Sequence, residues 1–219
     1  LQIPEEVSAE IDSATFGSIF HKSAENIYHD LTQHGKLINK EAIDSLLRND
    51  IRLENYVDES FKELFFHVDK EVKPEYNGIQ LLNSAVIVRY IKQLLGHDLR
   101  YAPFTLEATE LPVHEPITIQ TSEGPVESSI GGTIDRLDSK EGTLRIVDYK
   151  TGGQAETPGN VASLFIPDEK RPNYIFQTFL YASIMSRKED RKIAPSLLYI
   201  HRAASEDYSP VICLKEPRK

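Results

Sequence analysis

Apolar residues recur every three or four positions through most of the first hundred residues, which is the spacing of amphipathic helices. The pattern predicts helices at residues 16–34, 40–50, 55–67 and 79–97. Ser13 or Thr15 stands where a capping residue of the first helix is expected. The first part of the chain is therefore expected to be mainly helical.

The pattern changes near Tyr101 to short runs in which apolar and polar residues alternate, which favours strands. Strands are expected at residues 103–110 and 115–121, followed by a hairpin of 129–137 and 143–150 around the turn DSKEG. A long loop (151–172), a helix (173–187) and a buried strand (196–202) complete the prediction. These elements predict an α/β fold, with a central mixed sheet flanked by helices and preceded by a helical section.

The predicted hairpin brings charged residues together. Side chains at positions i and i+2 of a strand share a face, so Asp148 and Lys150 point the same way. The turn near Lys140 sets Asp135 roughly beside positions 146–148. Two carboxylates and one ammonium group are therefore expected to converge on one patch.

Two neighbouring carboxylates repel each other by a few kcal/mol at an intermediate dielectric, and a divalent cation removes that repulsion. Oxygen ligands of this kind suit Mg²⁺ or Mn²⁺. The predicted reaction is hydrolysis of a phosphodiester bond by a metal-activated water. An ordinary charged surface hairpin is the alternative, but Ile134, Ile146 and Val147 predict a buried strand region, where charges are normally paired or metal-bound.

The net charge and the cysteine content exclude some classes of protein and of site. A net charge of −9 argues against a simple electrostatic DNA clamp, although a carboxylate-rich metal site is itself acidic. The single cysteine, Cys213, excludes an internal disulfide and an iron–sulfur cluster in this segment, and it fits a cytoplasmic location. No apolar run is long enough to predict a membrane span. The chain begins with Leu1, so we expect a piece of a longer protein.

Four separated motifs within residues 16–182 carry a family resemblance. They are FGSIFH, which holds a G-x-x-x-H pattern from Gly17 to His21, then IDRLD, IVDYKTG and QTFLYA. In this order the motifs resemble the RecB-like branch of the PD-(D/E)XK nuclease superfamily, which includes the nuclease domains of RecB-type and AddB-type recombination proteins. The resemblance implies a restriction-endonuclease-like core.

The resemblance also implies roles for individual residues. His21, Asp135, Asp148 and the carbonyl of Tyr149 would be the metal ligands, and Lys150 would be the catalytic lysine. Gln177 and Tyr181 match a Q-x-x-x-Y motif and would support the site or contact DNA, although helix packing would also explain them. Glu107 or Glu110 could supply a further acidic group, with Glu110 slightly preferred.

The expected function is that of a Mg²⁺- or Mn²⁺-dependent deoxyribonuclease, with exonuclease action on single- or double-stranded DNA ends. The resemblance implies that residues 1–219 are one nuclease domain from the C-terminal part of a helicase–nuclease or AddB-like repair protein, working with a helicase domain or subunit. Residues 35–100 carry no motif and are expected to form a helical insertion or lid. The alternatives are a non-catalytic DNA-binding or scaffolding module with the same fold and a standalone nuclease of the CRISPR-adaptation kind.

Overall fold

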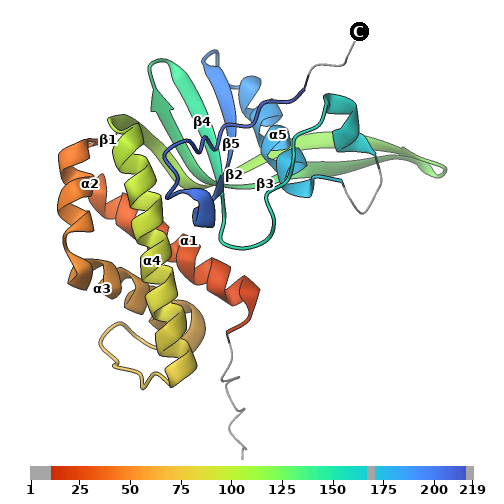
Figure 1. The fold of residues 1–219 in the computed structure, drawn as a ribbon. Coiled ribbons are helices and arrows are strands. Elements are labelled where there is room, and N and C mark those ends of the chain that lie inside the picture. Colours follow the sequence, from red (N-terminus) through yellow and green to blue (C-terminus); the bar gives the residue numbers. More distant parts are fainter. Residues whose placement is uncertain (1–10, 167–170, 216–219) are drawn as a thin grey trace, which may run out of the picture. The chain divides into compact units, whose positions relative to one another are not determined.

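A computed structural model describes residues 11–166 and 171–215. They form two compact units, which are described separately. The helical unit extends to Pro103 and also contains Ile200–Glu206, whereas the sheet unit contains Phe104–Tyr199 and the chain from Asp207 onward. Figure 1 labels the elements of both units. Among the described helices, none has both the length and the apolar character needed to cross a membrane.

The four predicted helices of the first unit are confirmed, with shifted ends. They are α1 (Ser13–Leu31), α2 (Lys40–Leu47), α3 (Asp50–Phe61) and α4 (Gly78–Tyr101). A π-helical turn, Lys62–Phe66, continues α3, and a two-residue strand, β1 (Leu37–Ile38), precedes α2. The expected cap of α1 was wrong. Asp12 caps the helix, because its carboxylate accepts the backbone N–H of Thr15 at 2.6 Å.

The core of the helical unit lies where α1, α3 and α4 contact one another. Each helix contributes apolar side chains that are at most 1% exposed: Ile19, Phe20, Ala24, Ile27 and Tyr28 from α1, Leu53, Val57 and Phe61 from α3, and Ile87, Ile91, Leu94 and Leu95 from α4. The Tyr28 hydroxyl donates a hydrogen bond to the buried carboxylate of Asp98. This polar link therefore joins α1 and α4 within the core.

The sheet unit contains a mixed sheet, as the sequence predicts. Its strands are β2 (Phe104–Thr121), β3 (Gly124–Lys140), β4 (Thr143–Lys150) and β5 (Lys192–Tyr199), and they lie in that order. The β2–β3 and β3–β4 pairs are antiparallel and the β4–β5 pair is parallel. Helix α5 (Asn173–Ser186) lies in the crossover between the two parallel strands. An α/β fold with an N-terminal helical section is thereby confirmed.

Three details of the strand prediction were wrong. Residues 103–110 and 115–121 belong to one strand, and β3 starts five residues earlier than expected. The last strand ends at Tyr199, and Ile200–Arg202 forms a short 3-10 turn. The predicted long loop contains a 3-10 helix, Val161–Phe165, and its residues 167–170 lie outside the described residues.

Helix α5 packs against one face of this sheet, where an apolar cluster holds the two together. The buried members are Val113, Ile134, Leu137, Leu144, Ile146, Tyr181, Ile184 and Met185. Such burial is the main stabilising term of a small unit, at roughly 25 cal/mol per Å² of apolar surface. The sheet is therefore a rigid base for the side chains on its other face.

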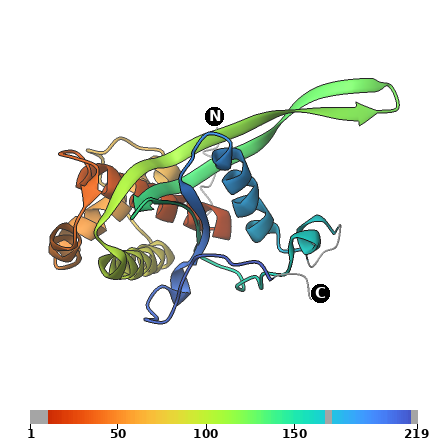
Figure 2. The same ribbon diagram turned by 90° about the horizontal axis from the view of Figure 1, so that it is seen from above.

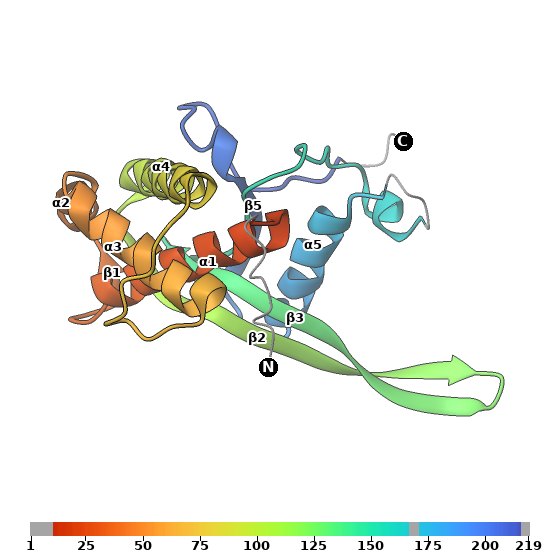
Figure 3. The same cartoon turned by 90° about the horizontal axis from the view of Figure 1, so that it is seen from below.

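The hairpin of β2 and β3 extends well beyond the other strands of its unit, as Figures 2 and 3 show. We call residues 112–133 the hairpin arm. Within the arm, β2 and β3 pair with each other from Pro112↔Thr133 to Thr121↔Gly124. The β3–β4 ladder involves only β3 residues from Arg136 to Lys140, so β4 pairs with no part of the arm.

Candidate functional site

The end of β4 carries an acid and a base on one face. Asp148 is 3% exposed, and its Oδ2 lies 2.6 Å from the Nζ of Lys150. This contact matches the i, i+2 spacing of the two residues in a strand. Tyr149 points to the other side of β4 and is also buried.

Asp135 meets the same end of β4 from β3. Its Oδ2 accepts a hydrogen bond of 2.6 Å from the backbone N–H of Tyr149. The β3–β4 ladder pairs Arg136 with Val147, so continuing the register by one residue sets Asp135 opposite Asp148. The structure therefore brings together the three hairpin residues that the sequence singled out.

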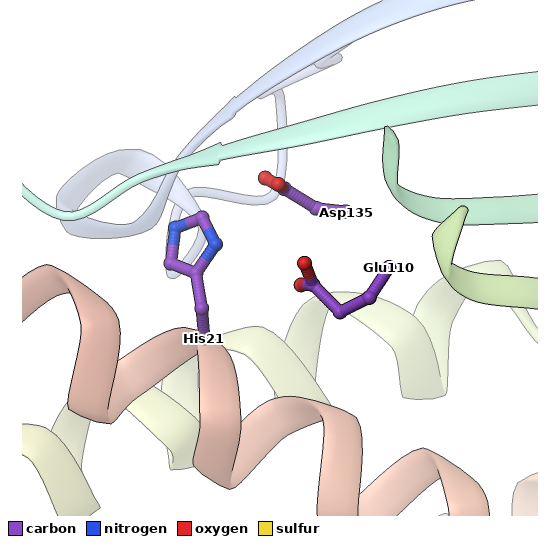
Figure 4. Close-up of side chains that lie close together, drawn as sticks. All are labelled: His21, Glu110 and Asp135. Carbon is purple, nitrogen blue, oxygen red and sulfur yellow. The ribbon is translucent and has the colours of Figure 1, made fainter. Parts of the chain in front are cut away.

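A fourth group, Glu110, comes from β2. The ladder pairs Thr109 with Arg136 and Leu111 with Ile134, so Glu110 stands opposite Asp135. Carboxylate oxygens of Glu110 and Asp135 lie within 4.8 Å of each other. Figure 4 shows both carboxyl groups turned to the same side.

The backbone is distorted on both strands at this pair. Ala108 and Leu111 both pack against the α5 cluster although they are three residues apart, and so do Ile134 and Leu137. In a regular strand, positions i and i+3 would point to opposite faces. The alternation is therefore reset once on each strand, at Glu110 and Asp135.

The reset on β2 coincides with an unusual backbone conformation, because Glu110 has a φ of 46°. Non-glycine residues rarely occupy the left-handed region, and such residues are concentrated at functional sites. The distortion falls where Glu110 stands opposite Asp135, and carboxylate oxygens of the two residues lie close together there.

Glu107, the other glutamate that the sequence offered for the site, forms hydrogen bonds elsewhere. Its Oε1 accepts hydrogen bonds from Ser139 Oγ and Arg191, each at 2.7 Å. The structure thus separates the two glutamates into a structural one and one beside Asp135.

Two carboxylates within 4.8 Å of each other repel by about 3 kcal/mol or more at an effective dielectric constant of about 20. A hard divalent cation bound by carboxylate oxygens removes this repulsion, and Mg²⁺ and Mn²⁺ prefer such ligands. The donor set of Glu110, Asp135 and the nearby Asp148 therefore fits a divalent metal ion.

His21 belongs to the helical unit, where it lies on α1 and is partly exposed. Its ring contacts the Phe20 ring edge-to-face, with 5.9 Å between centroids. Figure 4 labels His21 as well. The other residues predicted for the site all belong to the sheet unit.

Gln177 and Tyr181 lie one turn apart on α5, and the Gln177 Nε2 donates a 2.7 Å hydrogen bond to the Tyr181 hydroxyl. Tyr181 is buried in the α5 cluster. Its hydroxyl lies so close to Gly132 that a Cβ there would be 2.2 Å away. The pair therefore lies where α5 packs closely against β3, three residues before Asp135.

The second aspartate of the IDRLD motif has a structural role. Asp138 is fully buried and accepts two hydrogen bonds from Arg145, at 2.9 and 2.8 Å. The Nε of Arg136, which is also fully buried, lies 2.9 Å from the same carboxylate. The Arg136 guanidinium lies over the Tyr149 ring, 5.6 Å from its centroid. Sequence reasoning missed this triad because an arginine in a strand is normally expected at the surface.

A model of the PD-(D/E)XK nuclease superfamily matches residues 1–211. The chain belongs to the PD-(D/E)XK nuclease superfamily. No curated protein shows significant sequence similarity to it. The sequence Asp148-Tyr149-Lys150, which has the order of residues in the (D/E)XK part of the superfamily's name, lies beside Asp135 at the end of the β3–β4 hairpin. Membership of this nuclease superfamily supports nuclease activity, DNA as the substrate and use of a divalent metal ion.

Proposed function

We propose that this chain is a Mg²⁺- or Mn²⁺-dependent deoxyribonuclease of the RecB-like branch. The observation that carries the proposal is the convergence of Glu110, Asp135, Asp148 and Lys150 where β2, β3 and β4 lie side by side. A scaffold has no need to bring like charges together at a strained backbone position. The ordered motifs of residues 16–182 support the choice of branch.

In this proposal, Glu110, Asp135, Asp148 and the Tyr149 carbonyl hold the metal ion, and His21 adds a nitrogen ligand. A bound divalent cation would polarise a phosphoryl oxygen and lower the pKa of a coordinated water. The Tyr149 N–H fixes the orientation of the Asp135 carboxylate. Lys150 orients the attacking water and stabilises the negative charge that develops on the phosphoryl group.

We further propose that residues 1–219 form one exonuclease domain of a longer repair or recombination protein that acts on DNA ends with a helicase domain or subunit. Residues 35–100 would then be a helical insertion or lid. The single cysteine fits work in a reducing cytoplasm.

The test is cleavage of linear single- and double-stranded DNA by the full chain with Mg²⁺ or Mn²⁺. Asp148→Ala and Lys150→Ala should each lower the rate by roughly 100-fold or more, since each removes a group that acts on the reacting phosphate. Glu127→Gln, an exposed change on the hairpin arm, should leave the rate unchanged. Cleavage that survives both site variants would refute the proposal. Failure to bind Mn²⁺ in calorimetry, with DNA binding retained, would favour the non-catalytic module.

A further inference from the structure

We propose that Tyr174 is a positioning residue that holds the ammonium group of Lys150 in place, an inference that rests on the proposed nuclease function. The Lys150 Nζ lies 4.4 Å from the centroid of the Tyr174 ring. An ammonium group over the face of an aromatic ring is attracted by the ring's quadrupole. Lys150 thus has two anchors, the Asp148 carboxylate and this ring.

The contact with the Tyr174 ring matters because the Asp148 carboxylate has a second proposed role. Asp148 is a proposed metal ligand, and a carboxylate that shares its charge with a divalent cation attracts an ammonium group less strongly. The ring of Tyr174 carries no net charge and does not compete for the cation. A lysine side chain is flexible and loses rotamer entropy when it is ordered. The ring therefore keeps Lys150 oriented when the carboxylate serves the metal.

The position of the ring is itself fixed by the fold. Tyr174 lies in the first turn of α5, where the Glu156 carboxylate accepts the backbone N–H groups of Tyr174 at 3.2 Å and Ile175 at 2.9 Å. The backbone N–H of Glu156 donates to the Tyr199 hydroxyl at 3.0 Å. Glu156 thus connects the segment after β4 with the start of α5 and the end of β5.

Glu156 also affects the electrostatic environment of Lys150. The N-terminus of a helix carries a partial positive charge, which disfavours a nearby ammonium group. The Glu156 carboxylate supplies a negative charge at this helix end. Lys150 can therefore lie beside the first turn of α5 without a net repulsion from it.

Packing alone does not explain Tyr174. Its side chain is 40% exposed, whereas Ile175 beside it is 1% exposed and belongs to a core cluster with Leu197. An exposed aromatic ring in a nuclease could instead stack on a DNA base. That reading predicts an effect on DNA binding, and the experiments below separate it from positioning.

The first experiment tests the contact without any activity measurement. In the full chain labelled with ¹³C at the lysine ε-carbons, the Lys150 ε-methylene signal should be shifted upfield by the ring current of Tyr174. The signal is assigned by its loss in Lys150→Arg. Tyr174→Phe should keep the shift, and Tyr174→Leu, which has no ring, should abolish it. An unshifted Lys150 signal in the wild-type chain would overturn the contact.

The second experiment tests the role. Tyr174→Leu should lower kcat by about tenfold with KM nearly unchanged, because the cation–π interaction is worth up to about 2 kcal/mol. Tyr174→Phe should restore most of the rate, since its ring presents the same face to the ammonium group. In a Lys150→Ala background, Tyr174→Leu should have almost no further effect, because the two residues act as a unit.

Other outcomes decide against positioning. A raised KM with kcat unchanged would assign Tyr174 to DNA contact, and additive losses in the double variant would show that it does not act through Lys150. Unchanged Mn²⁺ binding and thermal unfolding of Tyr174→Leu are the controls for folding. Complete absence of cleavage by the wild-type chain would overturn the nuclease proposal, whereas the NMR shift would still decide the Tyr174–Lys150 contact separately.

Discussion

The Asp135 carboxylate accepts the backbone N–H of Tyr149 at the point where the β3–β4 ladder ends. One oxygen atom of Asp135 thus takes part in a hydrogen bond that stabilises the fold. The carboxylate as a whole keeps its negative charge, beside the carboxylate of Glu110. The structural and the proposed metal-binding roles of Asp135 can therefore be separated by substitution.

Asp135→Asn should keep the hydrogen bond to Tyr149 but lose the charge. We expect stability close to that of the wild type, together with loss of Mn²⁺ binding and of cleavage. Asp135→Ala should lose the hydrogen-bond acceptor as well, which should lower the free energy of unfolding by about 1–2 kcal/mol. Calorimetric Mn²⁺ titration and urea unfolding measure the two effects. Full Mn²⁺ affinity in Asp135→Asn would contradict the ligand assignment.

Gly132→Ala should destabilise the sheet unit by about 1–3 kcal/mol, because the new methyl group would overlap the Tyr181 hydroxyl and force α5 away from β3. Gly152→Ala is the matched control, since a Cβ at Gly152 meets nothing within 4 Å. Circular dichroism during thermal unfolding gives both stabilities. Equal melting temperatures would show that the contact at Gly132 is not tight.

Asp138→Asn should cost about 3–5 kcal/mol, because it leaves Arg136 and Arg145 buried without their counter-charge. Glu115→Gln breaks an ion pair with Arg187, which is 62% exposed, and should cost less than about 1 kcal/mol. Urea midpoints of the two variants provide the comparison. A loss of stability in Asp138→Asn as small as that in Glu115→Gln would mean that the fold does not depend on the triad.

The helical unit should lose stability in acid through Asp30. Hydrogen bonds from the Tyr56 hydroxyl and the Arg52 guanidinium hold the pKa of Asp30 below its ordinary value of 3.8. The folded state therefore binds fewer protons there than the unfolded state. The contribution is complete above about pH 4 and disappears as the pH falls through the lowered pKa.

Asp30→Asn should accordingly flatten the decline of melting temperature below about pH 4 and lower the melting temperature at neutral pH. Asp44→Asn breaks an exposed ion pair with Arg48 and serves as the control. Melting curves from acid to neutral pH measure the slopes. Parallel curves for Asp30→Asn and the wild type would contradict the assigned cause.

Helical periodicity was enough to predict α1 to α4, since each buries one apolar stripe. The strands were harder to predict. Residues 111–114 were expected to separate two strands, but β2 runs through them and through Pro112 and Pro116, because a proline is tolerated where a two-stranded hairpin leaves one edge of the strand open. The hidden signal was the i, i+3 spacing of Ala108 and Leu111, which marks the reset at Glu110.

The motif residues on β3 and β4 were predictable because strand register alone brings Asp135, Asp148 and Lys150 together. The placement of Glu110 beside Asp135 depended on the reset at Glu110, and a separate β-bulge between Leu106 and Ala108 falls at Glu107. Tyr174 could not be predicted as a partner of Lys150. Their contact depends on how the crossover from β4 places α5, and sequence spacing carries no information about that placement.

The hairpin arm gives β3 two different local stabilities. Residues 136–140 lie between β2 and β4, so their amide protons should exchange only when the whole sheet opens. A two-stranded ribbon is marginal by itself, so the arm's amide protons should exchange through a much less costly local opening. The boundary between slow and fast exchange falls at Asp135 and Glu110. The two proposed metal ligands therefore lie at the boundary between a stable and a less stable part of the sheet. A metal ion bound there should slow the hydrogen exchange of amide protons in the adjoining part of the arm.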